Sequence, residues 1–165
     1  MDFSEIYERH AKDVHRFAYY LSGNRAVAED LTSETFVRAL CVGSNLRVGT
    51  VKAYLFAIAR NLYRDTLASQ SHLSTADELP EPPDPHPGPH LEAEGRESFA
   101  HALRALQRLP ESEREAIVLS IDRDLKYEQI AAILGCSIAA VKVRICRARL
   151  KLRAELAGSE KPCKK

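Results

Sequence analysis

Several features that mark membrane, secreted or redox proteins are missing from this sequence. None of its 165 residues is tryptophan, and only one is methionine. No run approaches the eighteen or so uncharged apolar residues that a membrane-spanning helix needs. Residues 1–5 hold no basic run followed by an apolar core, so no secretory signal is expected. The four cysteines form no C-x-x-C pair, which favours free thiols in a cytoplasmic protein.

The net charge of +1 is nearly balanced, but its distribution along the chain is not. Residues 1–68 carry a net charge of +1, and residues 69–95 carry −6 with no basic residue at all. Residues 96–124 carry −1, whereas residues 125–165 carry +7. The balanced total therefore hides an acidic middle and a basic C-terminal segment, and such a segment favours a nucleic-acid partner.

Apolar residues recur at helical spacing, and no segment alternates as a strand would. The N-terminal part predicts three helices, over about 3–21, 26–41 and 51–68. The pattern returns at Leu91 and predicts four more helices, around 99–109, 116–121, 130–134 and 141–152. The expected fold class is all-α, with two small helical domains.

Residues 69–95 separate these two domains. Six of the eight prolines lie in this segment, together with six acidic residues and few apolar ones. Such a composition buries too little surface to offset the entropy of ordering, so we expect a flexible, extended linker. The predicted domains are residues 1–68 and 96–157, followed by a basic tail at 158–165.

Residues 126–145 carry the most informative local pattern: a short helix, a glycine turn and a longer helix. Gly135 suits a backbone position with positive φ, and Ser137 can cap the second helix. Val141 and Ile145 are expected to face inward, which turns a cationic face outward. A recognition helix in a DNA major groove needs such a face. The alternative is an ordinary helical hairpin with a solvated basic side.

Three segments, in this order, carry the motifs of one known family: Ala28–Arg38 (AEDLTSETFVR), Tyr54–Asn61 (YLFAIARN) and Leu109–Arg149. They resemble region 2.2, the junction of regions 2.3 and 2.4, and region 4 of sigma-70-type RNA polymerase sigma factors. The resemblance is strongest to the extracytoplasmic-function (ECF) class. It covers residues 1–68 and 96–156, and it implies a sigma region 2 bundle, a linker and a region 4 helix-turn-helix.

On the helix predicted at 26–41, Asp30, Glu34 and Arg38 share one face at i, i+4, i+8. Taken alone, this pattern is also that of a solvated helix with a Glu34–Arg38 pair. The resemblance implies that this face binds the clamp helices of the largest subunit of core RNA polymerase. The implied core-binding residues are Glu29, Asp30, Ser33, Glu34, Val37 and Arg38. Ser33 stands where the family often has glutamine.

The helix predicted at 51–68 combines an aromatic ring, an amide and cations on one face, which suits single-stranded DNA. Taken alone, it is also a helix end with scattered polar groups. The resemblance implies that this face melts and binds the −10 element, with a base captured by the loop at 45–52. The implied residues are Asn45, Arg47, Lys52, Tyr54, Arg60, Asn61 and Arg64. Tyr54 stands where the family commonly has tryptophan.

The helix-turn-helix would bind the −35 element as duplex DNA. Its implied DNA-binding residues are Ser137, Ala139, Ala140, Lys142, Val143, Arg144 and Arg147. The acidic linker at 69–95 is either a plain spacer or, as the resemblance implies, a strand that threads channels of the polymerase built for nucleic acid.

The resemblance thus implies a specificity subunit of RNA polymerase, not an enzyme, whose partners are core polymerase, promoter DNA and an anti-sigma factor. We expect no cofactor, no metal, no small-molecule substrate and no membrane insertion. A helix-turn-helix transcriptional regulator with a helical N-terminal sensor is the alternative, but it would not need the motifs at 28–38 and 54–61. A small helical enzyme would need a nucleophile–base pair, buried paired carboxylates or a metal cluster, and none is apparent.

Overall fold

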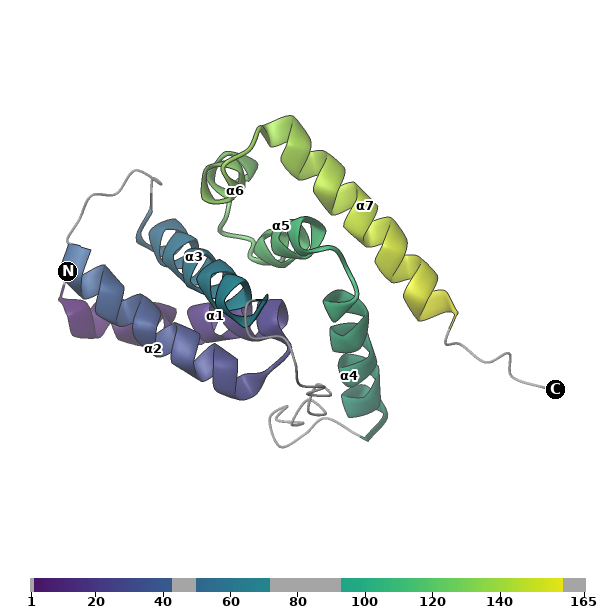
Figure 1. The fold of residues 1–165 in the computed structure, drawn as a ribbon, viewed down its shortest axis with the longest axis horizontal. Helices are drawn as coiled ribbons and strands as arrows, with labels where there is room; N and C mark the ends of the chain where they lie inside the picture. The colour runs from purple at the N-terminus through teal and green to yellow at the C-terminus, as the bar shows by residue number, and fades with distance from the viewer. Residues whose placement is uncertain (1, 43–49, 72–92, 159–165) are drawn as a thin grey trace.

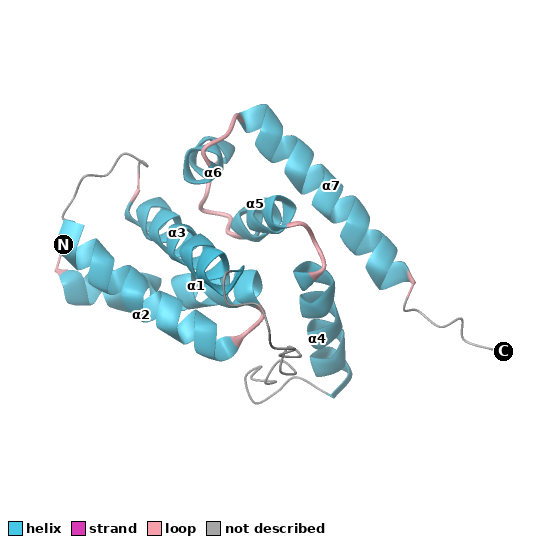
Figure 2. Ribbon diagram, viewed as in Figure 1, coloured by secondary structure: helices cyan, strands magenta, loops and turns pink. Residues whose placement is uncertain are grey.

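A computed structural model describes residues 2–42, 50–71 and 93–158, and these form helices and turns without a strand (Figures 1 and 2). The helices are α1 (Phe3–Ser22), α2 (Arg25–Val42), α3 (Val51–Ser71), α4 (Ala93–Gln107), α5 (Glu111–Ile121), α6 (Tyr127–Leu134) and α7 (Ile138–Ala157). The all-α prediction is confirmed. We call α1–α3 the N-terminal half and α4–α7 the C-terminal half.

The predicted loop at 43–49 and most of the predicted linker lie outside the described residues. Both ends of that predicted linker are helical, because α3 continues to Ser71 and α4 begins at Ala93. Nothing in residues 69–71 breaks a helix, and the Ser69 hydroxyl donates to the carbonyl of Asp65 at 3.0 Å, as a serine inside a helix can. Composition therefore placed the start of the linker a few residues too early.

The N-terminal half packs three helices around aromatic rings. The inward face of α1 buries Val14, Phe17, Ala18 and Leu21, and its last turn ends at Gly23, whose φ of 66° is the left-handed conformation predicted for a helix end. Phe17 stacks on Phe56 of α3 with ring centroids 4.8 Å apart. These contacts fix α3 against α1, while α2 covers both (Figure 1).

In the C-terminal half, α6 and α7 meet at a bend of 93°, within the range of DNA-binding helix-turn-helix motifs. Gly135 ends α6 with φ 64°, and the Ser137 hydroxyl accepts a hydrogen bond from the Ala140 amide at 3.1 Å. Val141 and Ile145 are buried beneath α7. The predicted turn glycine, helix cap and inward-facing pair are all confirmed.

The two halves pack against each other, which the sequence did not predict. In Figure 1, α5 lies between α3 and α7, and α6 lies above one end of α3. Val118 and Ile121 of α5 line the same narrow cleft as Phe17 and Phe56, and the buried apolar residues of both halves form one continuous cluster. The sequence indicated two domains and a linker, but not this arrangement.

A hydrogen bond fixes one end of the contact between the halves. The Gln107 side chain donates from Nε2 to the carbonyl of Tyr20 in the last turn of α1, at 2.8 Å. Arg114 donates to the side-chain oxygen of Gln107 at 3.0 Å, which sets the orientation of that amide. A Cβ atom at Gly23 would lie 2.8 Å from Gln107 Cγ, so this close approach also requires glycine.

Candidate nucleic-acid interface

The outer face of α2 is open to solvent. All six residues implied for core binding are exposed: Glu29, Asp30, Ser33, Glu34, Val37 and Arg38. The opposite face of α2 is buried, and it includes Thr32 and Thr35, whose hydroxyls donate to backbone carbonyls one turn earlier at 2.6 Å. The helix thus separates a packed side from a free one.

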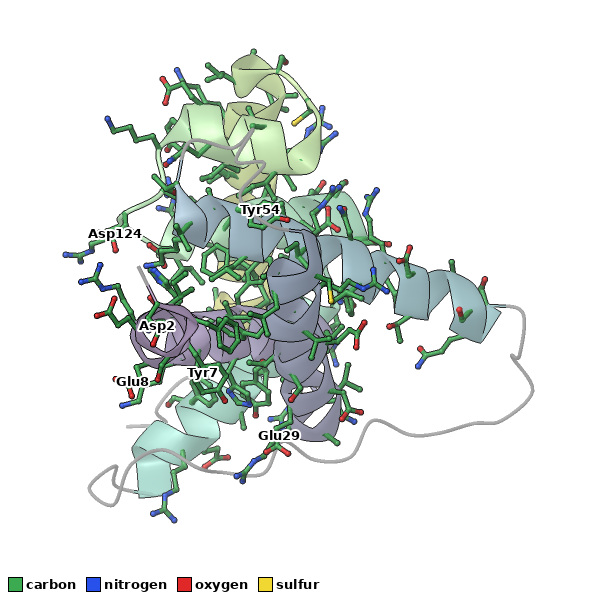
Figure 3. All side chains as sticks on the ribbon, turned by 90° about the vertical axis from the view of Figure 1, so that its left-hand side faces the viewer. Asp2, Tyr7, Glu8, Glu29, Tyr54 and Asp124 are labelled. Atoms are coloured by element: carbon green, nitrogen blue, oxygen red, sulfur yellow. The ribbon has the colours of Figure 1, made fainter. Side chains whose placement is uncertain are left out.

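Charge and apolar surface alternate on this outer face of α2. Arg25 pairs with Glu29 at 3.1 Å, and Arg38 pairs with Glu34 at 3.0 Å. Val37 and Leu40 are more than half exposed. Leu40 was missed by sequence reasoning, although its position three residues after Val37 places it on the same side of the helix. In Figure 3, Glu29 lies at the end of α2 far from α6.

The recognition helix α7 also presents an open face. Ser137, Ala139, Lys142, Val143 and Arg147 are exposed, while Ala140 and Arg144 are half-buried. The first turn of this helix offers backbone N–H groups and the positive end of the helix dipole, which together favour a phosphate.

An aromatic residue of α6 adds to this face. The Lys142 ammonium lies 6.0 Å from the centroid of the Tyr127 ring, at the limit of a cation–π contact. Tyr127 is itself exposed and was not among the predicted DNA-binding residues. Its position as the first residue of α6, within the helix-turn-helix at 126–145, was the signal that could have identified it.

The C-terminal half contacts the cations of α3 and encloses two of them, Lys52 and Arg60. Asn45 and Arg47 lie outside the described residues. Of the other five residues implied for −10 binding, Asn61 is exposed and Tyr54 is half-buried. The remaining three are cations, and each contacts acidic groups of the C-terminal half: Lys52, Arg60 and Arg64. In Figure 3, Tyr54 lies just below the α6–α7 pair.

Arg60 and Glu115 form a buried ion pair between the halves. The Arg60 side chain donates from Nε to Glu115 Oε2 at 3.0 Å and from Nη1 to the Ile133 carbonyl at 3.0 Å. Arg64 donates to the other oxygen, Glu115 Oε1, also at 3.0 Å, and lies 3.2 Å from Glu111. Glu115 is completely buried. A buried carboxylate requires such partners, because an unpaired charge away from water is strongly unfavourable.

Lys52 is surrounded by three carboxylates. Its ammonium lies 2.7 Å from Asp122 and 3.0 Å from Asp124, both in the turn after α5, and 2.9 Å from Asp13 of α1. Burial alone lowers the pKa of Lys52, but its hydrogen bonds to these three carboxylates outweigh that effect and raise the pKa above the usual lysine value. Lys52 is therefore cationic at physiological pH.

Known proteins match both halves of this chain. A model of Sigma-70 region 2 matches residues 6–72, and a model of Sigma-70 region 4 matches residues 101–152. The ECF RNA polymerase sigma factor EcfG of Rhodopseudomonas palustris is 39% identical over 145 residues, covering 85% of this chain and 77% of the relative. This chain belongs to the sigma-70 family, in its ECF class.

Further relatives agree with this membership. The sigma factor SigE of Mycolicibacterium smegmatis is 37% identical over 159 residues, which is 94% of this chain and 62% of that longer relative. The sigma factor RpoE of Bartonella quintana, solved with the anti-sigma factor NepR, has a TM-score of 0.81 and 29% identity. That likeness covers 97% of this chain and 99% of the solved one. Members of this family are transcription initiation factors rather than enzymes.

The acids that contact the cations of α3 are a further set of residues that sequence reasoning missed. Glu115 left one signal: it directly precedes the buried Ala116 and stands three and four residues before the buried Val118 and Leu119. A carboxylate on the apolar side of a helix indicates a buried partner. Asp122 and Asp124 lie in a turn, where acidic residues are common, so they left no such signal.

The described ranges of this sigma factor contain no cluster of three or more metal-ligating side chains. Within the same ranges, no single helix is long and apolar enough to cross a membrane, and only α6 and α7 taken together, across their 93° bend, combine the length and apolar composition for it.

Proposed function

We propose that this ECF sigma factor binds core RNA polymerase, directs it to promoters with particular −10 and −35 elements, and promotes melting of the DNA. The observation that carries this proposal is the solvent-exposed cationic face of α7, held by buried Val141 and Ile145 within a helix-turn-helix. The relatives named sigma factors support it and do not favour a regulator with a sensor domain.

We assign core-polymerase binding to the outer face of α2. Its acidic residues Asp30 and Glu34 are exposed beside the apolar Val37 and Leu40. A surface with apolar area at its centre and charges around it can bury area while the charges fix the orientation of the partner. The other residues implied for this surface, Glu29, Ser33 and Arg38, are exposed on the same helix.

For the −35 element we assign α7 and the turn before it. The N-terminus of α7 would hold a phosphate through its backbone amides, and Arg144 and Arg147 would contact base edges or phosphates in the major groove. The exposed side chains of Ala139 and Val143 are small and apolar, which lets the helix approach the bases and contact thymine methyl groups.

The −10 element would be bound by α3 as a single strand. Tyr54 would stack on a base, Asn61 would contact a base edge, and the cations of α3 would hold phosphates. Asn45 and Arg47, outside the described residues, remain proposed members of this surface. Lys52 and Arg60 would be reachable only when the two halves separate, because both are enclosed in this structure, whereas Arg64 is exposed.

We also propose an anti-sigma factor as a partner. The RpoE neighbour was solved with an anti-sigma factor, and a second neighbour, CnrH, was solved with the cytosolic domain of CnrY, with a TM-score of 0.70 and 26% identity. As a binding subunit, the protein would itself catalyse no reaction and need no cofactor or small-molecule substrate. It would act in the cytoplasm, where core polymerase and the chromosome lie.

In vitro transcription with purified core polymerase and a library of genomic fragments tests the function. Addition of the protein should produce transcripts that start at a small set of fragments sharing −10 and −35 motifs. A protein that binds duplex DNA but neither associates with core polymerase nor initiates transcripts would be a regulator, and the proposal would be wrong.

A further inference from the structure

An apolar cavity lies where the end of α1 meets the C-terminal half. It has a volume of about 280 Å³ and is lined by side chains of α1, α4, α5 and α7. Among the described residues that line it, Tyr20 alone has a polar group in its side chain. In Figure 1, α4 lies between the last turn of α1 and the C-terminal end of α7. The cavity is thus built by helices that are far apart in the sequence.

Large apolar side chains at this cavity are partly open to solvent. Phe99 is 40% exposed, Ile121 is 50% exposed and Leu156 is 37% exposed. Single exposed apolar residues are common on protein surfaces, whereas several around one hollow indicate a binding site. An apolar group placed in the cavity would remove their surface from water, which is favourable.

The volume of the cavity favours a small occupant. Ligand sites usually have volumes of about 300–1,000 Å³, and this cavity lies just below that range. A partner protein needs an interface of at least about 1,000 Å² and would have to bury most of it elsewhere. A methylene group fills about as much space as a water molecule in the liquid, roughly 30 Å³, so an unbranched chain of about nine or ten carbons fits.

Cations border the cavity on its α7 side. Arg149 stands three residues before Leu152, and Arg153 stands three residues before Leu156. Because residues at this spacing are neighbours on a helix surface, each arginine lies beside a side chain that lines the cavity. Both arginines are exposed, so they can attract an anionic group at the mouth of the cavity.

The α1 side is less suited to an anion. Arg16 stands one turn before Tyr20, but its guanidinium is paired with Asp13 at 3.0 Å. Asp122 lines the same narrow cleft as Arg16, which adds a second carboxylate there. An anionic head group is therefore favoured on the α7 side.

We propose that this cavity binds a free medium-chain carboxylic acid, whose chain lies between the four helices and whose carboxylate lies beside Arg149 and Arg153. The ligand is an effector that is bound and released unchanged, not a substrate. Because it contacts only the folded protein, it stabilises that protein increasingly as its concentration rises. The site is separate from the surfaces assigned above to core polymerase and to DNA.

Isothermal titration calorimetry of the full-length protein with sodium decanoate, below its micelle concentration, provides the first test. Each methylene removed from the chain should weaken binding about fourfold, the factor for a buried methylene group, so octanoate should bind about 15-fold more weakly than decanoate. Dodecanoate should gain little, because its two further methylenes exceed the cavity. Absence of decanoate binding, or equal binding of decanoate and hexanoate, would overturn the proposal.

A variant that fills the cavity provides the second test. Ala102 lines the cavity and is exposed, so Ala102→Phe places a ring in it without entering the core. Binding of decanoate should fall at least tenfold, and decanoate should no longer raise the melting temperature. Ser98→Phe adds the same ring at an exposed position of α4 outside the lining and serves as the control. If both variants keep their helices by circular dichroism and bind decanoate like the wild type, the ligand lies elsewhere and the proposal is wrong.

The role of the two arginines is tested with the variant Arg149→Gln/Arg153→Gln. It should bind decanoate roughly two- to fivefold more weakly, as expected for exposed ion pairs, and bind decanol as the wild type does. Lys12→Gln/Arg104→Gln changes the net charge equally at exposed sites of α1 and α4 and should bind decanoate normally. Equal losses in the two double variants would contradict the placement of the carboxylate.

Vesicles of phosphatidylglycerol distinguish a free acid from a membrane surface. The protein should not sediment with them, because the cavity admits a single short chain. Sedimentation with vesicles, together with no binding of free decanoate, would mean that the apolar mouth contacts a bilayer and would overturn the proposal. None of these measurements depends on core polymerase or on promoter DNA, so they stand apart from the test of the proposed function.

Discussion

Two helices of this sigma factor carry cations proposed to bind DNA, and they differ in what covers them. On α7, Lys142 and Arg147 point into solvent. On α3, Lys52 and Arg60 are enclosed by carboxylates of the other half. The residue types are alike, so composition does not explain the difference. It arises because α7 packs on one side only, whereas α3 contacts α1 and α2 on one side and α6 on the other.

This difference implies an order of events for promoter binding. The proposed −35 surface on α7 would be available first, and the proposed −10 surface on α3 only once Lys52 and Arg60 leave their carboxylate partners. Such an order is reasonable, since duplex DNA is present from the first encounter and a single strand appears only when the promoter melts. Four predictions test the comparison, from the largest expected effect to the smallest.

The free energy of unfolding should depend much more on a buried arginine of α3 than on an exposed arginine of α7. Arg60→Met leaves the buried Glu115 with Arg64 as its remaining guanidinium partner, so the free energy of unfolding should fall by about 3 kcal/mol. Arg147→Met, at an exposed position, should change it by less than about 0.5 kcal/mol. Urea denaturation followed by circular dichroism measures both. In the double variant Arg60→Met/Glu115→Met, much of the lost free energy of unfolding should be recovered. Equal effects of Arg60→Met and Arg147→Met would contradict the comparison.

Duplex binding should depend on α7 alone. Loss of a base-contacting arginine in Arg144→Ala or Arg147→Ala should weaken binding of holoenzyme to its preferred −35 sequence by about 1–3 kcal/mol and relax the preference at one position. Arg64→Ala on α3 is the matched variant and should leave −35 preference unchanged. Competition assays with −35 promoter variants across salt concentrations report both. Unchanged affinity and preference in both α7 variants would mean that another element contacts the −35 element.

Core binding should be independent of whether the halves are open or closed, because the α2 face is exposed in the closed form. Asp30→Lys/Glu34→Lys should weaken association with core polymerase on the order of tenfold or more, through like-charge repulsion at the interface. The fold should stay as in the wild type, because both residues are exposed. A pull-down with core polymerase and circular dichroism test this. Normal core binding by the double variant would remove the assignment of α2.

The smallest expected effect concerns pH. Burial, and then the nearby Lys52, lower the pKa of His10 below its usual 6.5, with Arg9 acting in the same direction and Asp13 and Asp122 opposing. Above pH 6.5 His10 is neutral in both folded and unfolded protein. As pH falls below that value the unfolded chain takes up the proton first, so the free energy of unfolding should fall. In His10→Asn this part of the pH dependence should disappear from urea-denaturation curves measured between about pH 5.5 and about pH 7.5, roughly one unit on either side of the usual histidine value. An unchanged pH profile would show that His10 does not contribute.

Most of the local structure could be predicted from the sequence. The helix ends at Gly23 and Gly135, the cap at Ser137 and the inward pair Val141 and Ile145 follow from spacing within one or two turns. The six residues on the outer face of α2 are exposed as their helical spacing indicates. The family could be identified as well, because its motifs are contiguous and occur in order.

The closed arrangement could not be predicted in the same way. Arg60 and Arg64 lie one turn apart on α3 and look equivalent in sequence, yet one is buried and the other exposed. Their shared partner Glu115 is 55 residues away from Arg60, beyond a predicted linker, and the carbonyl of Ile133 is 73 residues away. Helical periodicity holds no information on contacts at that distance.

The sequence by itself therefore determined the helices, the helix-turn-helix and the family, since each depends on interactions among residues within a few turns or on motifs in a fixed order. Only the tertiary structure decided which cations are free. That depends on the docking of α5 and α6 against α3, where a carboxylate removed from water needs a guanidinium partner and finds it in the other half of the molecule.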